Sequence, residues 1–197
     1  MQTIIKDINQ LDLDGTYTYA DYLLWQFEER LELIKGKIFK MSPAPSRTHQ
    51  TILGKLHLTI GLFFRNHFCQ VFLAPFDVRL PKKNQDASDG KIYTVVQPDI
   101  CIICDEAKLD DKGCLGAPDL IIEILSPGNS KKEMDNKFTL YEECGVREYW
   151  LVEPAENAVF MYVLNEEGKY IGRKPAISKL TSSIFPELTI DLEEVFG

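Results

Sequence analysis

The chain has 197 residues, of which 45% are hydrophobic and 26% charged, and this composition predicts one folded domain over residues 1–197 rather than a disordered or fibrous chain. The net charge of −8 excludes general electrostatic attraction as the basis for binding nucleic acid, so such a ligand would need local basic groups. No apolar run approaches the roughly 20 residues that cross a bilayer, and the N-terminus lacks a signal-peptide pattern, so we expect a cytoplasmic protein with no membrane partner.

Periodicity and turn residues divide the chain into alternating helices and strands. The predicted elements, in chain order, are a helix over 16–29, a hairpin over 30–42, a helix over 47–68, a strand or bent strand pair over 69–80, strands over 93–104 and 118–125, a helix from Ser130 to Gly145, and strands over 147–154 and 158–164. Lys35–Gly36 supplies the hairpin turn, and Pro75 predicts a bulge or an edge strand. Ser130 followed by Glu133 predicts a capping box.

The order of these elements predicts a mixed sheet with helices packed on it, because strands and helices alternate with no repeat and no linker between them. We take residues 16–165 as the core, and the last 30 residues, which are weakly patterned, as a C-terminal extension over 166–197. The five cysteines lie mostly in apolar segments, which favours buried free thiols in a reducing cytoplasm over a disulfide framework.

A carboxylate interrupts the most apolar strand of the chain. Glu123 lies within "PDLIIEIL", and burying a carboxylate without a partner is costly. Asp119 precedes it on the same face, but about 13 Å away at ~3.3 Å per residue, so the two cannot hold one ion. Because consecutive strands often pair, Asp99 of "VVQPDICII" is the carboxylate that we expect beside Glu123.

Two adjacent carboxylates predict a cation between them, because they otherwise repel each other. Mg²⁺ suits such a site, since it binds one or two carboxylates and completes its shell with water and phosphate. Lys137 lies inside the apolar stripe of the helix that follows, at i+3 from Met134 and i−4 from Tyr141. It could serve the site, or its stem could lie along apolar surface with the amine in water. For Asp99 and Glu123, the alternatives are strand-end capping and an internal hydrogen-bonded pair.

Four blocks in order, "LELIKGKIFKMSP", "QPDI", "APDLIIEILSP" and "DNKFTLYEECGVREYWLVEP", resemble the PD-(D/E)XK nuclease superfamily and, within it, the Uma-type restriction endonuclease family, over residues 16–165. The resemblance implies an α/β fold of mixed α+β type: a restriction-endonuclease-like core with a central mixed sheet flanked by helices, preceded by the N-terminal hairpin. It also implies metal-dependent hydrolysis of phosphodiester bonds.

The resemblance also assigns the candidate site. Asp99 matches the metal-binding aspartate, Glu123 matches the acidic position of the motif, and Glu32 matches an acidic position in the family's hairpin. The motif lysine would fall on Leu125, so the resemblance implies that Lys137 on the next helix replaces it. We expect Asp99, Glu123 and the Ile124 carbonyl to hold Mg²⁺, for which Mn²⁺ can substitute.

Two further polar residues have open roles. A histidine in line with a helical stripe is usually a hydrogen-bonded core or boundary residue, but the family pattern leaves a supporting site role open for His49. Asp119 begins its strand, a position that favours capping of backbone groups or bracing of the sheet over binding metal.

We therefore expect a Mg²⁺-dependent endonuclease that acts on DNA as a homodimer, since cutting both strands of a duplex calls for two sites. Two alternatives stay open. One is a noncatalytic nuclease-fold module that binds nucleic acid or protein, which the acidic charge and Leu125 favour. The other is a nuclease that acts on RNA or on branched substrates.

Overall fold

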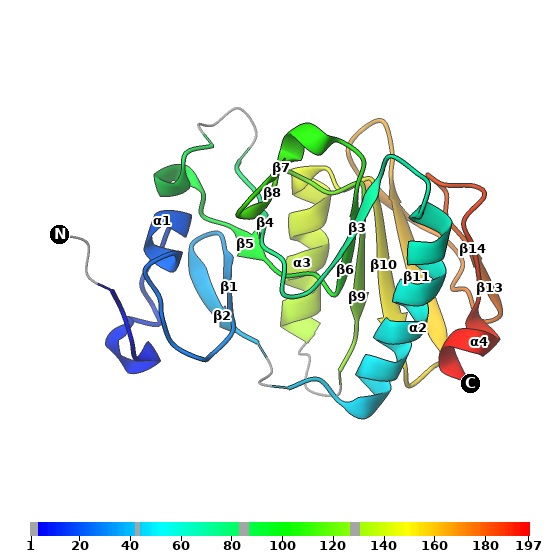
Figure 1. Cartoon of the computed structure of the whole chain (residues 1–197), viewed down its shortest axis with the longest axis horizontal. Coiled ribbons are helices and arrows are strands. Elements are labelled where there is room, and N and C mark those ends of the chain that lie inside the picture. Colours follow the sequence, from blue (N-terminus) through cyan, green and yellow to red (C-terminus); the bar gives the residue numbers. More distant parts are fainter. Residues whose placement is uncertain (1–3, 42–43, 83–86, 127–130) are drawn as a thin grey trace.

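A computed structural model describes residues 4–41, 44–82, 87–126 and 131–197, without the side chains of 131–133. Within these ranges the chain forms two six-stranded sheets, a two-stranded sheet and four α-helices (Figure 1). None of the described helices has the length and apolar character needed to span a membrane.

The first sheet contains the predicted hairpin. Its strand order is β2-β1-β5-β4-β8-β7, with bounds Lys37–Lys40, Leu31–Ile34, Val95–Val96, Val78–Arg79, Gly113–Leu115 and Leu109–Asp110. β1 and β2 pair antiparallel around Lys35 and Gly36, which both have positive φ, at 53° and 81°. This is the backbone of a tight two-residue turn, so the predicted hairpin and its turn are confirmed.

The second sheet contains the strand with the unexpected glutamate. Its order is β12-β11-β10-β9-β6-β3, with bounds Tyr170–Gly172, Ala158–Leu164, Glu148–Glu153, Leu120–Ile124, Ile100–Ile103 and Gln70–Leu73. β9 and β10 are parallel and are connected through α3 (Lys131–Cys144), whereas the other pairs are antiparallel. β3 lies at the edge, just before Pro75, as the proline predicts.

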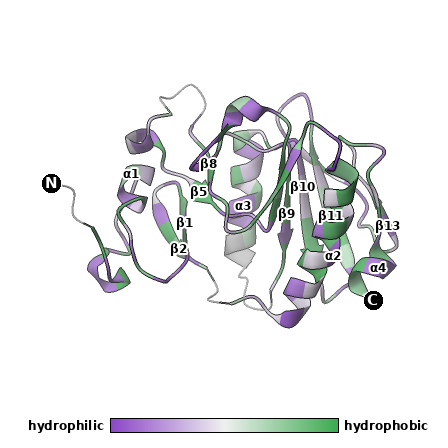
Figure 2. Cartoon of the chain, in the orientation of Figure 1, coloured by the Kyte–Doolittle hydropathy of each residue, from purple (hydrophilic) through white to green (hydrophobic). Residues whose placement is uncertain are grey.

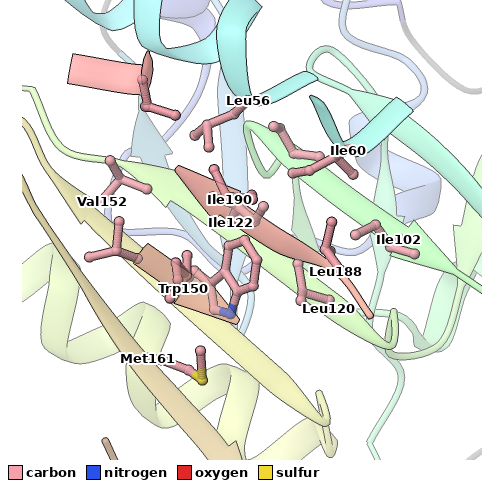
Figure 3. Close-up of a cluster of buried hydrophobic side chains, with 14 of the residues drawn as sticks. Leu56, Ile60, Ile102, Leu120, Ile122, Trp150, Val152, Met161, Leu188 and Ile190 are labelled. Carbon is pink, nitrogen blue, oxygen red and sulfur yellow. The ribbon is translucent and has the colours of Figure 1, made fainter. Parts of the chain in front are cut away.

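Two hydrophobic cores lie on the two faces of the second sheet. On one face, α2 (Arg47–Phe64) packs together with the C-terminal β13 (Lys179–Thr181), β14 (Thr189–Asp191) and α4 (Leu192–Phe196) (Figures 1 and 3). On the other face, α3 lies between the two sheets and packs against both. The strands that α2 and α3 cover bury many apolar side chains, and Figure 2 shows the hydrophobic character of β11. Residues 166–197 thus contribute to the main core although their sequence is weakly patterned.

Alternating side chains on β9 separate the two cores. Leu120, Ile122 and Ile124 point toward α2, whereas Ile121 belongs to the core around α3. Glu123 therefore shares the face of Ile121 and points toward α3 and the first sheet. This placement brings its carboxylate next to two elements that are distant in sequence.

Two predicted helices are shorter than expected. The helix predicted over 16–29 is only α1 (Tyr19–Tyr22), with a capping box between Thr18 and Asp21. It ends early because the following backbone pairs with Ile5, through Ile5 N–H to the Leu24 carbonyl at 3.0 Å and Gln26 N–H to the Ile5 carbonyl at 2.7 Å. The helix predicted over 47–68 ends at Phe64, where the chain turns toward β3. The capping box at Ser130 lies outside the described residues.

The single strand predicted over 93–104 is wrong. Its two halves, β5 and β6, belong to different sheets, and the segment 97–99 crosses between them. β3 and β4, predicted as a strand or bent pair over 69–80, divide between the sheets in the same way. The expected central mixed sheet is therefore accompanied by a second sheet, and the crossing segments lie where the two approach each other.

The expectation of free thiols is correct for some cysteines and wrong for others. Cys101 and Cys114 are buried free thiols. Cys69 and Cys104, in contrast, form a disulfide. They flank β3 and β6, whose register pairs Gln70 with Ile103, so the next residues outward are cross-strand neighbours. Sequence spacing alone does not reveal that proximity.

Candidate active site

Polar side chains from four elements lie close together where the two sheets approach each other. β1 carries Glu32, the end of β9 carries Glu123, α3 carries Lys137, and the crossing segment before β6 carries Asp99. Ile100 pairs with Ile122 across the antiparallel β6–β9 ladder, and continuing that register by one residue places Asp99 opposite Glu123. The sequence-based expectation that these two carboxylates lie on paired strands is confirmed.

Lys137 lies between two carboxylates. Its Nζ donates to Glu32 Oε1 and to Glu123 Oε1, both at 3.0 Å, and the lysine is only 9% exposed. Burial alone would lower the pKa of Lys137, but Glu123 and Glu32 outweigh it and the pKa is raised. Lys137 is therefore a fixed cation at neutral pH, and its amine is held by the two carboxylates inside the site instead of lying along the protein surface.

Glu123 is held at one oxygen. Tyr141 donates its hydroxyl to the same Oε1 at 2.6 Å, so all the described contacts of this carboxylate fall on Oε1. Burial raises the pKa of Glu123 to about 7, and the nearby Asp99 and Glu32 act in the same direction against Lys137. A cation bound near Oε2 would favour the ionised form.

Asp99 is held in a similar way. Its Oδ2 accepts from the Ile124 backbone N–H at 2.8 Å and contacts His49 Nε2 at 3.1 Å. The contact with Asp99 raises the pKa of His49, whose ring is buried at the start of α2. His49 thus orients Asp99. This is a supporting role of the kind that the sequence left open for His49.

The two carboxylates face a common cavity of about 130 Å³. Its walls include Glu32, His49, Asp99, Glu123 and Lys137, together with Ile124. The cavity is partly open, so water can enter.

The donor set fits a hard divalent cation. Asp99 and Glu123 each use one oxygen in contacts that fix the side chain, and the opposite oxygen of each makes no described contact. Within the described part of the chain, no three His, Cys, Asp or Glu side chains converge to enclose a metal by themselves. Two carboxylates with a backbone carbonyl, completed by water and phosphate, is the coordination that suits Mg²⁺.

Asp119 lies at the opposite end of β9 from Glu123. Its Oδ2 accepts from the Cys104 backbone N–H at 2.9 Å, and its Oδ1 accepts from Arg147 Nη1 at 2.9 Å. These contacts cap β6 and brace the sheet, which was the preferred interpretation of this residue.

Sequence reasoning missed three residues around the site. The Gln97 backbone N–H donates to Glu32 Oε1 at 2.8 Å, and its side-chain Oε1 accepts from Arg30 Nη2 at 2.8 Å. Tyr141 looked like an ordinary core residue of a helical stripe, although its hydroxyl bonds Glu123. The one available signal for these residues was the position of Gln97 directly before the PD dipeptide, whose aspartate was already a candidate metal ligand.

The fold and this site together define the class of the protein: a mixed α/β protein with carboxylates and a lysine gathered at a sheet end. A solved structure of a "putative nuclease belonging to DUF820" from Anabaena variabilis superposes with a TM-score of 0.71, covers 91% of this chain and 97% of its own, and is 22% identical. At that identity the likeness shows the shared fold.

The chain belongs to the Uma2 family, described as "Putative restriction endonuclease", whose profile matches residues 19–193. The resemblance found in the sequence is thereby confirmed. A curated relative, the uncharacterized protein slr1290 of Synechocystis, is 24% identical over 158 residues, which are 77% of this chain and 76% of the relative. The family match extends well past residue 165, in agreement with the packing of the C-terminal segment on the main core.

Proposed function

We propose that the protein is a Mg²⁺-dependent endonuclease that hydrolyses phosphodiester bonds in DNA. The observation that carries this proposal is the arrangement of Lys137, Glu32 and Glu123 beside Asp99 in a partly open cavity. Membership of a nuclease-type family supports the same reaction class. Mn²⁺ is expected to substitute for Mg²⁺.

Each residue has a role that follows from its contacts. Asp99 and Glu123 would hold the metal through the oxygens opposite those fixed by His49, Tyr141 and Lys137, and the Ile124 carbonyl would add a ligand. When bound, Mg²⁺ supplies charge stabilisation for the phosphate and lowers the pKa of water.

Lys137 acts as a cation rather than as a base, because its raised pKa keeps it protonated. Its amine can donate to the attacking water and offset charge on the phosphate as water displaces the 3′ oxygen in line. Glu32, supported by the Gln97 N–H, holds that amine in place, and we propose that it also supports the outer shell of the metal.

Nicking of supercoiled plasmid with Mg²⁺ or Mn²⁺ tests the proposal. Wild type should nick the plasmid, whereas Asp99→Ala and Lys137→Ala should each lose roughly 10²–10³-fold in rate, the usual effect of removing one charged group from a preorganised site. Asp119→Asn, which alters a carboxylate outside the site, is the matched control and should retain activity.

The outcomes separate the hypotheses. Equal activity in all variants would indicate a contaminating nuclease. Absence of cleavage by wild type on duplex, single-stranded and branched DNA, together with no stabilisation by either metal, would replace the proposal with the noncatalytic module. Cleavage of RNA but not DNA would keep the site and change the substrate. The cytoplasmic location and the homodimer, with one site for each strand of a duplex, belong to the same proposal.

A further inference from the structure

A second cavity, of about 250 Å³, lies next to the candidate active site. Arg30 and Gln97 line both cavities, and the consecutive residues Ala74 and Pro75 line one each. The side chain of Gln97 lies at their boundary, where its Oε1 accepts from Arg30 and its Nε2 donates to Asp77 Oδ1 at 2.9 Å and to the Tyr22 hydroxyl at 3.3 Å. A ligand that extends past the carboxylates therefore meets this second cavity directly.

Aromatic rings form the wall of the second cavity. Tyr22, Trp25 and Phe27 all line it and are all half-buried. The Trp25 ring lies 5.5 Å from Tyr22 and 5.9 Å from Phe27, centroid to centroid, with the Phe27 ring stacked at an interplanar angle of 25°. Proteins that bind single-stranded nucleic acid use such aromatic rings to stack bases.

Arg30 supplies positive charge at the boundary of the two cavities. Its guanidinium donates to the neutral amide of Gln97, through Nη2 at 2.8 Å and Nε at 3.3 Å. Within the described part of the chain no carboxylate pairs with it, so its charge is not neutralised by an ion pair. A guanidinium with remaining donors suits bidentate contact with a phosphate.

Two glutamates determine which part of a nucleotide the cavity can accept. Glu28 and Glu29 are exposed and line the same cavity beyond Arg30. They repel a continuous phosphate backbone, but their oxygens can accept hydrogen bonds from the amino groups of a base. The cavity is thus suited to a base that turns in from the backbone at Arg30.

We propose that this cavity, defined by Tyr22, Trp25, Phe27 and Arg30, binds an unpaired nucleobase of the substrate while Arg30 holds the phosphate that joins it to the cleaved position. The proposal rests on the proposed nuclease function and narrows its substrate to nucleic acid with a single-stranded nucleotide beside the cut. A paired base would first have to leave the stack and break its pairing, so an unpaired base is favoured over one in an intact duplex.

The two tryptophans make this testable in the wild-type protein. Trp150 is fully buried in the main core (Figure 3), whereas Trp25 lines the cavity. A single-stranded DNA 12-mer added in EDTA, which prevents metal-dependent cleavage, should quench tryptophan fluorescence by stacking on Trp25. A 12-mer with abasic sites should bind roughly 5- to 150-fold more weakly, as expected for loss of one stacked base. A blunt duplex should give no quench.

Variants locate the effect. Trp25→Phe should remove the quench while anisotropy of a labelled 12-mer still reports binding, and Arg30→Gln should weaken binding about 10-fold. Arg65→Gln, an exposed arginine at the end of α2 away from His49, is the matched control and should bind like wild type. Equal affinity for the abasic 12-mer, or an equal quench in Trp25→Phe, would overturn the proposal.

Plasmid nicking of the same preparation separates the two proposals. Cleavage without a quench would remove the base site and keep the nuclease. A quench that depends on Trp25, without cleavage of any substrate, would keep the base-binding cavity and remove the nuclease function.

Discussion

A single lysine, Lys137, connects the two sheets at the candidate site through hydrogen bonds to a carboxylate on each. Lys137 is buried and lies 3.0 Å from one oxygen of Glu32 on the first sheet and one oxygen of Glu123 on the second. Removing one partner from a buried ionic group is far more costly than the net contribution of an exposed pair, because the remaining charges are left uncompensated. The residue that we assign to catalysis is therefore also structural.

Replacing Lys137 with methionine tests that structural role. In EDTA at pH 8.5, the Lys137→Met variant should lose about 3–5 kcal/mol in the free energy of unfolding by urea, because Glu32 and Glu123 lose the cation that they share. Adding Glu32→Gln should recover part of the lost free energy of unfolding, because one fewer carboxylate is then buried without the Lys137 amine. A single variant as stable as wild type would show that the amine does not compensate these carboxylates.

The residues that could be predicted from the sequence are those whose chemistry conflicts with a local pattern. Glu123 stands out in an aliphatic strand, and Lys137 stands out in an apolar stripe. The roles of Tyr141 and Gln97 could not be predicted, because a tyrosine in such a stripe is ordinary and Gln97 was marked only by its position beside the PD dipeptide. Their importance comes from contacts between distant elements, to Glu123 in one case and to Arg30 and Glu32 in the other.

At the scale of elements, strands that change sheet create the site. β5 and β6 are nearly continuous in sequence, yet they lie in separate sheets, and the crossing segment between them carries Gln97 and Asp99. Local periodicity is the same for one long strand and for two short ones, so the pattern could predict the extended conformation but not the change of sheet. The hairpin was predictable, in contrast, because the Lys35–Gly36 turn is specified locally.

The disulfide gives a prediction for the edge of the second sheet. Cys69–Cys104 joins the edge strand β3 to β6, which leads back to Asp99. Reduction, or Cys69→Ser, should lower the free energy of unfolding by roughly 2–4 kcal/mol, because the open chain gains conformational freedom when unfolded. Urea unfolding with and without dithiothreitol measures this. The variant should be insensitive to dithiothreitol, and an equal response of variant and wild type would contradict the assignment.

At the scale of the whole molecule, the C-terminal segment closes the main core. β13, β14 and α4 cover the same sheet face as α2, and this segment contributes Leu180, Leu188, Ile190, Leu192 and Val195 to the core. Glu148 at the start of β10 attaches it, because its Oε2 accepts from the backbone N–H groups of Ser183 and Ile184, both at 2.9 Å. Its Oε1 accepts from Trp150 Nε1 at 2.6 Å.

This anchor predicts how stability depends on pH. Burial raises the pKa of Glu148 above its ordinary value of 4.5, although the hydrogen bonds from Trp150 and from Ser183 and Ile184 oppose the shift. Between 4.5 and the raised pKa, the folded protein holds a proton that the unfolded chain has released. The free energy of unfolding therefore falls as pH rises through this window and levels off above it.

Urea unfolding of wild type and Glu148→Gln across pH 4–8 isolates the contribution, because other buried carboxylates such as Glu123 titrate in both proteins. The glutamine cannot ionise but keeps an oxygen that accepts from the backbone N–H groups. The stability of wild type relative to the variant should decrease with rising pH and then stay constant. Parallel curves would mean that folding does not raise the pKa of Glu148.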